Sequence, residues 1–171
     1  RMRSDVGVTH TDSIHYYDIC DYLIDEEAIS VQGVMKDTMG RGMDDISISF
    51  INYPNTLVQI ESGYFAPGKW RDITIIGSKQ TIVVDIVKQS AKVYFNYFEK
   101  KNDIIIPHEN GSRTHLISNA EPLKLELSEF LNSLDSRKKP IADASIGLKM
   151  IKIYEAVKES AEQKKEIFLT N

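Results

Sequence analysis

The chain has 171 residues, of which 42% are hydrophobic, and it carries a formal net charge of −4 at pH 7. This length and hydrophobic content fit one domain with a core of its own. The acidic balance and the short basic runs argue against a nucleic-acid or anionic-membrane surface, because such surfaces need clustered Lys and Arg.

The single cysteine, Cys20, excludes an internal disulfide and favours a reducing, cytoplasmic location. No apolar run approaches the roughly 20 residues that a membrane-spanning helix needs. The first residues also lack the apolar stretch of a signal peptide. We therefore expect a cytoplasmic protein without a membrane contact.

The first predicted element is a helix that begins at Thr11 or Asp12 and ends at 26–27. The side-chain oxygen of either residue would accept a free backbone N–H of the first turn. One face of this helix carries His15, Asp18, Ile19 and Tyr22. We expect His15 to lie beside the first turn, near the core but not deep inside it.

Several strands follow in succession. A first strand is predicted over 28–35, and strands at 46–50 and 58–64 alternate between apolar and polar side chains, which is typical of half-buried strands. Further strands are predicted at 73–76, 81–87 and 92–98. Their short connections permit only antiparallel neighbours, so we expect one open sheet.

The polar loop at 37–44 contains Gly40-Arg41-Gly42, which superficially resembles a phosphate-binding loop. This loop leads into a strand and not into a helix, so the sequence does not favour a nucleotide site there.

After these strands, 104–107 predicts a short edge strand, because proline cannot donate to a central ladder. Two amphipathic helices follow, one beginning at Pro122 and one at Asp143 or Ser145, and 167–169 predicts a last short strand. We expect both helices on one face of the sheet. The fold class is therefore α+β, an open, mostly antiparallel sheet with helices packed on one face, in a single domain over 1–171.

Two groups of residues could carry chemistry on residue type alone. His10, Asp12 and His15 could ligate a metal, but no fourth ligand stands at a suitable spacing, so a metal site is not favoured. The loop residues Lys69, Trp70 and Arg71 suit a sugar or a phosphate group, and the alternative is a solvated connection with a packed Trp. For His15 the alternative is a hydrogen-bonded histidine at the helix start.

Three stretches carry a resemblance when they are taken together and in order. They are Gly7 to Leu23 with its Ile14-His15-Tyr16-Tyr17-Asp18 run, Arg71 to Asp85, and Glu121 to Ala161. They resemble the opening segment, the sheet motif and the closing helices of the second domain of the glucose-fructose oxidoreductase/inositol dehydrogenase (Gfo/Idh/MocA) family. The resemblance covers nearly the whole chain, and it implies the fold of the dihydrodipicolinate reductase-like or glyceraldehyde-3-phosphate dehydrogenase-like C-terminal domains.

The resemblance also implies a reaction, the NAD(P)-dependent oxidation or reduction of a sugar or polyol. His15 matches the histidine near the substrate hydroxyl that loses its proton. Thr11 stands where the family has an acidic residue, and Asp12 is displaced from that position by one. We take Thr11 and Asp12, together with Lys69, Trp70 and Arg71, as candidate substrate-binding residues.

Enzymes of this family begin with a dinucleotide-binding domain that has a glycine-rich turn and a Glu-Lys-Pro lysine, and this sequence contains neither. We therefore expect NAD or NADP to be bound by an N-terminal Rossmann domain that is absent from this chain. We expect no cofactor and no metal in the chain alone, and no catalysis by it.

The expected partners are a sugar or nucleotide-sugar substrate and further copies of the chain. Val83, Val87, Tyr94 and Phe98 lie on strands with apolar side chains on both faces, which is more than one helical layer needs. This pattern predicts a homo-oligomer formed through the sheet. The alternative function is a non-catalytic module that uses the sheet for self-association or for binding a partner chain.

Overall fold

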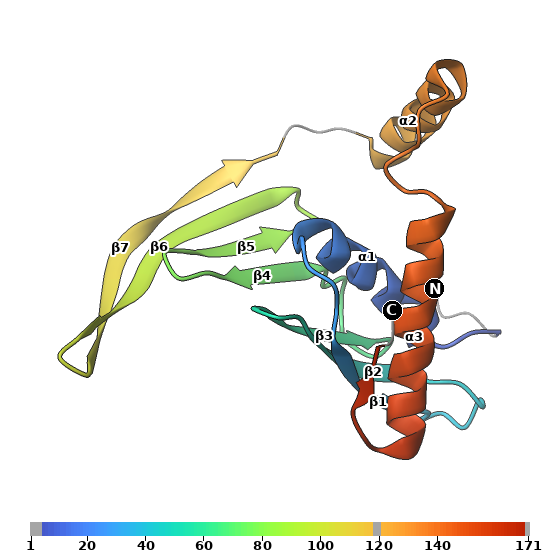
Figure 1. Cartoon of the computed structure of the whole chain (residues 1–171), viewed down its shortest axis with the longest axis horizontal. Helices are drawn as coiled ribbons and strands as arrows, with labels where there is room; N and C mark the ends of the chain where they lie inside the picture. The colour runs from blue at the N-terminus through green and yellow to red at the C-terminus, as the bar shows by residue number, and fades with distance from the viewer. Residues whose placement is uncertain (1–4, 118–120, 170–171) are drawn as a thin grey trace. The chain divides into compact units, whose positions relative to one another are not determined.

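The computed structural model describes residues 5–117 and 121–169 and divides into two compact units (Figure 1). Unit 1 takes in the chain up to Phe65 and from Lys139 onward, and unit 2 is Ala66–Lys138. Each unit has its own four-stranded antiparallel sheet. The predicted α+β class is confirmed, but the single open sheet that we expected is two separate sheets.

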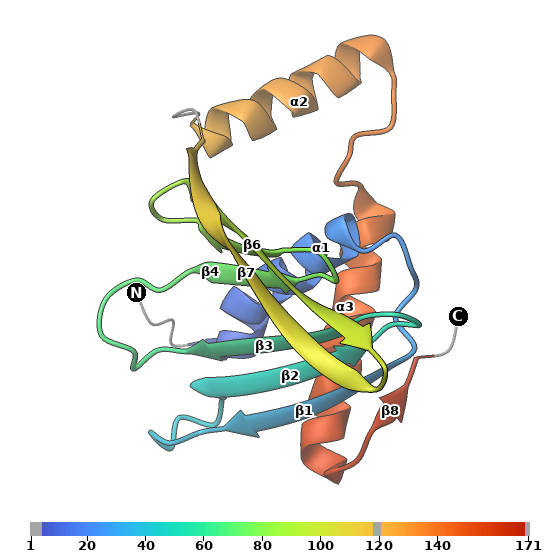
Figure 2. The same cartoon turned by 90° about the vertical axis from the view of Figure 1, so that its left-hand side faces the viewer.

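Unit 1 contains all the described residues that are fully buried. Its elements are η1 (Thr9–Ser13, π-helical), α1 (Ile14–Leu23), β1 (Ser30–Lys36), β2 (Ile46–Asn52), β3 (Leu57–Gly63), α3 (Ala144–Gln163) and β8 (Ile167–Phe168). The strand order is β3-β2-β1-β8, which Figure 2 shows side by side with α3 crossing one face. The predicted strands at 28–35 and 167–169 and the helix capped by Asp143 are confirmed, with Asp143 Oδ1 accepting from Ser145 N at 2.9 Å.

The core of unit 1 lies between this sheet and the helices α1 and α3. It consists of Tyr17, Ala28, Val31, Ile51, Tyr53, Ile60, Met150, Ile153, Ala156 and Val157. In β2 the alternation is as predicted, but the fully buried positions are Ser47, Ser49 and Ile51 rather than the larger apolar residues between them. The buried serines leave room for large side chains from α1, and the other face of β2 is half-buried.

Helix α3 lies close to the sheet of unit 1 at Gly33 in the middle of β1. A Cβ at this position would lie 2.4 Å from the carbonyl oxygen of Val157 on α3. The Gly33 backbone N–H donates to Ser160 Oγ at 3.0 Å, so α3 is joined to β1 by a hydrogen bond as well as by packing. Only glycine permits this contact without a shift of the helix.

Unit 2 comprises β4 (Asp72–Ile76), β5 (Thr81–Asp85), β6 (Ser90–Lys101), β7 (Ile104–Leu116) and α2 (Pro122–Ser136), with strand order β4-β5-β6-β7. The edge position predicted for Pro107 is confirmed, in a strand that is 13 residues long rather than short. None of the described residues of this unit is fully buried within the chain.

The helix predicted from Pro122 is confirmed as α2, but its predicted packing on a sheet face is wrong. Its apolar stripe is more than half exposed at every large position, namely Leu123, Leu127, Phe130, Leu131 and Leu134. Helical spacing of apolar residues indicates that a face is to be buried and does not indicate which surface buries it. Among the described helices, none is both long and apolar enough to span a membrane.

Replacing Gly33 by alanine should destabilise unit 1 by about 1–3 kcal/mol, because the added methyl group overpacks against the backbone of α3. The matched control is Gly147→Ala in α3, where nothing lies within 4 Å of the added Cβ. That change should stabilise the helix by up to about 1 kcal/mol. Urea unfolding of both variants checks this, and an equal effect of the two changes would contradict it.

Candidate functional site

The predicted site residues Thr11, Asp12 and His15 lie together on one helical segment of unit 1. This segment begins at Thr9 and not at Thr11 or Asp12, so the predicted cap is wrong. The first turn is instead capped by Asp44, whose Oδ2 accepts from Thr9 N at 2.8 Å and from Thr9 Oγ1 at 2.6 Å. His15 therefore lies beyond the first turn of the segment.

The opposite side of the segment is fixed in the core by Tyr17. Its ring is completely buried and its hydroxyl lies 2.7 Å from Ser49 Oγ on β2. Burial raises the pKa of Tyr17 to about 12, so the phenol stays protonated and hydrogen-bonded at neutral pH. The side chains of residues two apart on a helix are rotated by about 200° from each other around the helix axis. Because Tyr17 points into the core, His15 points outward, and it is exposed.

Among the residues that the structure describes, no carboxylate is hydrogen-bonded to the ring of His15. We considered Asp18 and Asp12 as groups that would orient it, but in the described chain neither hydrogen-bonds to the ring. Asp12 instead accepts from the hydroxyl of Thr11 at 3.0 Å, and Asp18 is exposed. His15 is thus available to a ligand on the surface of unit 1.

Thr11 is the most connected of the predicted residues. Its hydroxyl lies 3.1 Å from the carbonyl oxygen of Gly7 and 2.7 Å from the hydroxyl of Tyr64, which follows β3. The guanidinium carbon of Arg41 lies 5.8 Å from the centre of the Tyr64 ring. Thr11 therefore joins the helical segment to the end of the sheet.

Lys69, Trp70 and Arg71 belong to unit 2, in the loop that leads into β4. Trp70 is 72% exposed, and its indole N–H donates to the carbonyl oxygen of Pro67 at 2.6 Å. The alternative of a packed Trp is therefore wrong. The ring is fixed by a local hydrogen bond while its face remains open, which suits stacking on a ligand.

Two functional candidates, Asp44 and Tyr64, were missed at the sequence level. Asp44 ends a polar loop in which the Asp37 carboxylate accepts from the backbone N–H groups of Arg41 at 3.0 Å and Gly42 at 2.7 Å. These hydrogen bonds lower the pKa of Asp37. The glycine and acidic residues of the loop signal a tight turn, but no local pattern links Tyr64 to Thr11.

The same loop was compared with a phosphate-binding turn on the sequence. Its glycines, Gly40 and Gly42, have positive φ values, but the loop leads into β2, as predicted, and no helix N-terminus follows it. A pyrophosphate needs such a terminus in a glycine-rich nucleotide site. The residues of this loop therefore do not fit the cofactor.

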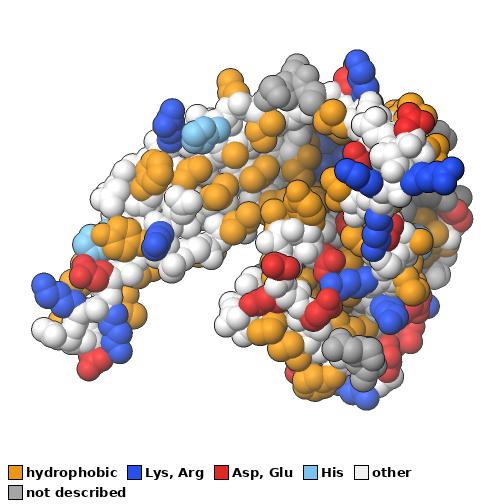
Figure 3. Space-filling view, turned by 45° about the horizontal axis from the view of Figure 1, so that its top comes forward, with side chains coloured by type: hydrophobic (Ala, Val, Ile, Leu, Met, Phe, Trp, Pro, Cys, Tyr) orange, Lys and Arg blue, Asp and Glu red, His pale blue; other side chains and the backbone are white. Residues whose placement is uncertain are grey.

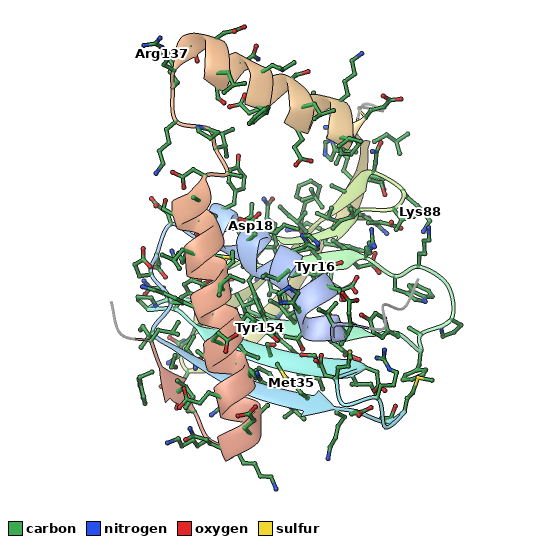
Figure 4. All side chains as sticks on the ribbon, turned by 90° about the vertical axis from the view of Figure 1, so that its right-hand side faces the viewer. Tyr16, Asp18, Met35, Lys88, Arg137 and Tyr154 are labelled. Carbon is green, nitrogen blue, oxygen red and sulfur yellow. The ribbon has the colours of Figure 1, made fainter. Side chains whose placement is uncertain are left out.

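A separate cavity of about 560 Å³ lies on unit 1 and does not include His15. His10 and Asp44 line it from the N-terminal segment and the loop, and Met35 and Tyr154, both labelled in Figure 4, line it from β1 and α3. The rings of His10 and Tyr154 meet edge to face with centroids 5.1 Å apart. Over residues 5–117 and 121–169, no three His, Cys, Asp or Glu side chains are grouped to hold a metal ion.

One protein-family model matches almost the whole chain. The model described as "Oxidoreductase family, C-terminal alpha/beta domain" matches residues 3–169. The chain therefore belongs to the Gfo/Idh/MocA oxidoreductase family and contains its C-terminal domain, as the resemblance implied.

Solved structures of oxidoreductases have the same fold. Levoglucosan dehydrogenase in complex with NADH has a TM-score of 0.81 and 17% identity, over 97% of this chain and 51% of that one. UDP-N-acetylglucosamine 3-dehydrogenase from Acidithiobacillus ferrooxidans has a TM-score of 0.79 and 16% identity, over 95% and 50%. An NAD-binding protein from Listeria innocua has a TM-score of 0.75 and 22% identity, over 95% and 47%.

The chain thus spans about half the length of these structures, and identities this low show the fold alone. No curated protein sequence matches the chain.

Replacing Tyr17 by phenylalanine should cost about 1 kcal/mol of unfolding free energy at pH 7, because the buried Ser49 hydroxyl loses its partner. Since the pKa of Tyr17 is raised in the folded state, this contribution should be fully present below about pH 10 and fall only at higher pH. Urea unfolding at pH 7 checks the value. Tyr22→Phe, at a residue 76% exposed on the same helix, should change nothing.

Proposed function

We propose that this chain is the substrate-binding half of an NAD(P)-dependent oxidoreductase that acts on a hydroxyl-bearing carbon of a sugar or polyol. The observation that carries the proposal is the outward position of His15 on a helix whose other side is anchored by Tyr17. In this proposal His15 is the catalytic residue, and the ring nitrogen takes up the proton of the substrate hydroxyl.

Histidine suits this role because its ordinary pKa lies near neutrality, so the ring both accepts and returns a proton at working pH. Thr11 and Asp12 bind the substrate from the same helical segment. Lys69, Trp70 and Arg71 of unit 2 are further candidate substrate-binding residues, and the open face of Trp70 is available for stacking on a sugar ring.

NAD or NADP, when bound, would supply the acceptor for the hydride that leaves the carbon. We assign the binding of that cofactor to a part of the whole protein outside this chain, because the glycine-bearing loop of the chain does not fit it. The chain alone is then catalytically inactive and binds no dinucleotide. The proposal is supported by similar structures that are named as sugar dehydrogenases, among them complexes with NADH and levoglucosan.

In the whole protein, His15→Ala should lower kcat on the sugar substrate by about 100-fold or more, which is the loss expected for a positioned acid–base group. His15→Asn should be equally inactive, because the amide cannot take up the proton. Steady-state kinetics checks both variants, with cofactor affinity measured by fluorescence and folding by circular dichroism.

The matched control is His10→Ala, which removes an exposed histidine that lines the cavity without His15 and should leave kcat unchanged. Near-normal turnover of the His15→Ala variant would make His15 a structural residue and move the acid–base role elsewhere in the whole protein.

We also assign self-association to the sheet of unit 2. The strand register places Ile73, Ile75, Ile82, Val84, Ala91 and Val93 on one face. Val83 and Tyr94 lie on the opposite, more polar face with Lys92. Figure 3 shows apolar side chains spread over this sheet. None of the six residues on this apolar face is fully buried within the chain, so the face is suited to packing against a second copy of the chain. The non-catalytic module, as the alternative function, would use the same face.

Replacing Ile82 by glutamate, at the centre of this face between Ile75 and Val93, should convert the oligomer into a monomer, because a charge would be buried without a partner. Light scattering of the whole protein at tens of micromolar checks this. Thr74→Glu puts the same charge on the opposite, exposed side and should leave the mass unchanged. A wild-type protein that is monomeric at this concentration would contradict the assignment.

A further inference from the structure

Tyr64 meets the helical segment that carries His15 from a distant part of the chain. It follows β3 directly, and its hydroxyl lies 2.7 Å from Thr11 Oγ1 across 53 residues of sequence. Residues four apart on a helix are neighbours, with Cβ atoms about 5–6 Å apart. Thr11 therefore lies one helical turn before His15, and the phenolic oxygen of Tyr64 lies beside Thr11.

The direction of the hydrogen bond between Tyr64 and Thr11 follows from counting protons. The Thr11 hydroxyl has one proton and three acceptors close to it, at 3.1 Å (Gly7 O), 3.4 Å (Val8 O) and 3.0 Å (Asp12 Oδ2). When that proton goes to one of these three acceptors, the phenolic O–H of Tyr64 makes the 2.7 Å contact by donating to Thr11 Oγ1. The Tyr64 oxygen keeps its lone pairs, so it is an acceptor.

The Tyr64 ring is also held in place. The backbone N–H of Tyr64 donates to the carbonyl oxygen of Asp45 at 3.1 Å, and the Arg41 guanidinium lies 5.8 Å from the ring centre. The side chain is half-buried, so part of it faces solvent. A side chain that is held by these contacts and is partly open to solvent is suited to ligand recognition.

We infer that Tyr64 is a substrate-binding residue, whose oxygen accepts a hydrogen bond from a sugar hydroxyl next to the one that His15 deprotonates. This inference rests on the proposed function and extends it. It selects for substrates with two neighbouring hydroxyl groups, because a deoxy substrate would leave the phenolic oxygen without its partner.

Calorimetry of the whole protein tests this with three probes, myo-inositol, D-glucose and UDP-glucose, which represent a polyol, an aldose and a nucleotide sugar. NADH is added because it cannot accept a hydride, so binding is measured without turnover. Tyr64→Phe should raise the Kd of the bound probe about ten-fold, the effect expected for losing one hydrogen bond to a ligand.

A variant of Thr11 tests the contact that fixes Tyr64. Thr11→Val removes the hydroxyl that lies 2.7 Å from the Tyr64 hydroxyl and should weaken binding as Tyr64→Phe does. Tyr22→Phe is the control for an exposed tyrosine on α1. In kinetics, Tyr64→Phe should raise KM more than it lowers kcat and leave the pH profile of kcat unchanged. A loss of folding would instead lower kcat.

Unchanged probe binding by the Tyr64→Phe variant would overturn this inference and leave the role of His15 standing. Turnover retained by His15→Ala would overturn the proposed function and leave the binding result standing. Failure of all three probes to bind the wild type would overturn both the substrate class and the inference.

Discussion

The arrangement of unit 1 depends on the contact between Gly33 and α3. A side chain at Gly33 would meet the backbone of Val157, and the space that glycine leaves lets α3 lie directly on β1. The same helix is tied to α1 by an ion pair, in which Lys149 Nζ lies 2.5 Å from Asp21 Oδ1 and 3.0 Å from Glu27 Oε2. Burial opposes the charge of Lys149, but hydrogen bonds to these carboxylates outweigh it and raise the pKa of Lys149, so the amine is charged at neutral pH.

This packing also decides which side of α1 is available for function. Because α3 and the sheet enclose one side of the segment, Tyr17 is buried at full depth and bonded to Ser49. The position two residues earlier must then face outward. The exposure of His15 is thus a consequence of the core beneath it, and a change in the depth of Tyr17 would move the histidine that the proposed chemistry uses.

The local elements of this fold could be predicted from sequence because each has a period or a cap. Asp143 begins α3 through hydrogen bonds to residues two and three positions on, which is a purely local signal. The start of the first helix was misplaced because its cap is Asp44, which is 35 residues away from Thr9 in sequence. A contact at that separation leaves no trace in local spacing.

The same distinction explains the site and the sheets. His15 and Thr11 share one segment and one motif, so a family resemblance could point to both, whereas Tyr64 is joined to them only by the fold. The alternation along β2 and β3 was predicted, although the fully buried face of β2 carries Ser47 and Ser49. Period alone does not say where one sheet ends and the next begins. In α2 the apolar stripe was likewise correct, and it has no covering surface within its own unit.

The measurement that tests the central claim most directly is NMR of this chain's four histidine rings, observed in the whole protein during titration with the sugar substrate in the presence of NADH. The account predicts that the His15 ring signals shift with saturation of the sugar while those of His115 stay unchanged. A substrate that saturates the protein without moving the His15 signals would contradict the account, because the histidine that takes up the proton must touch the hydroxyl that loses it.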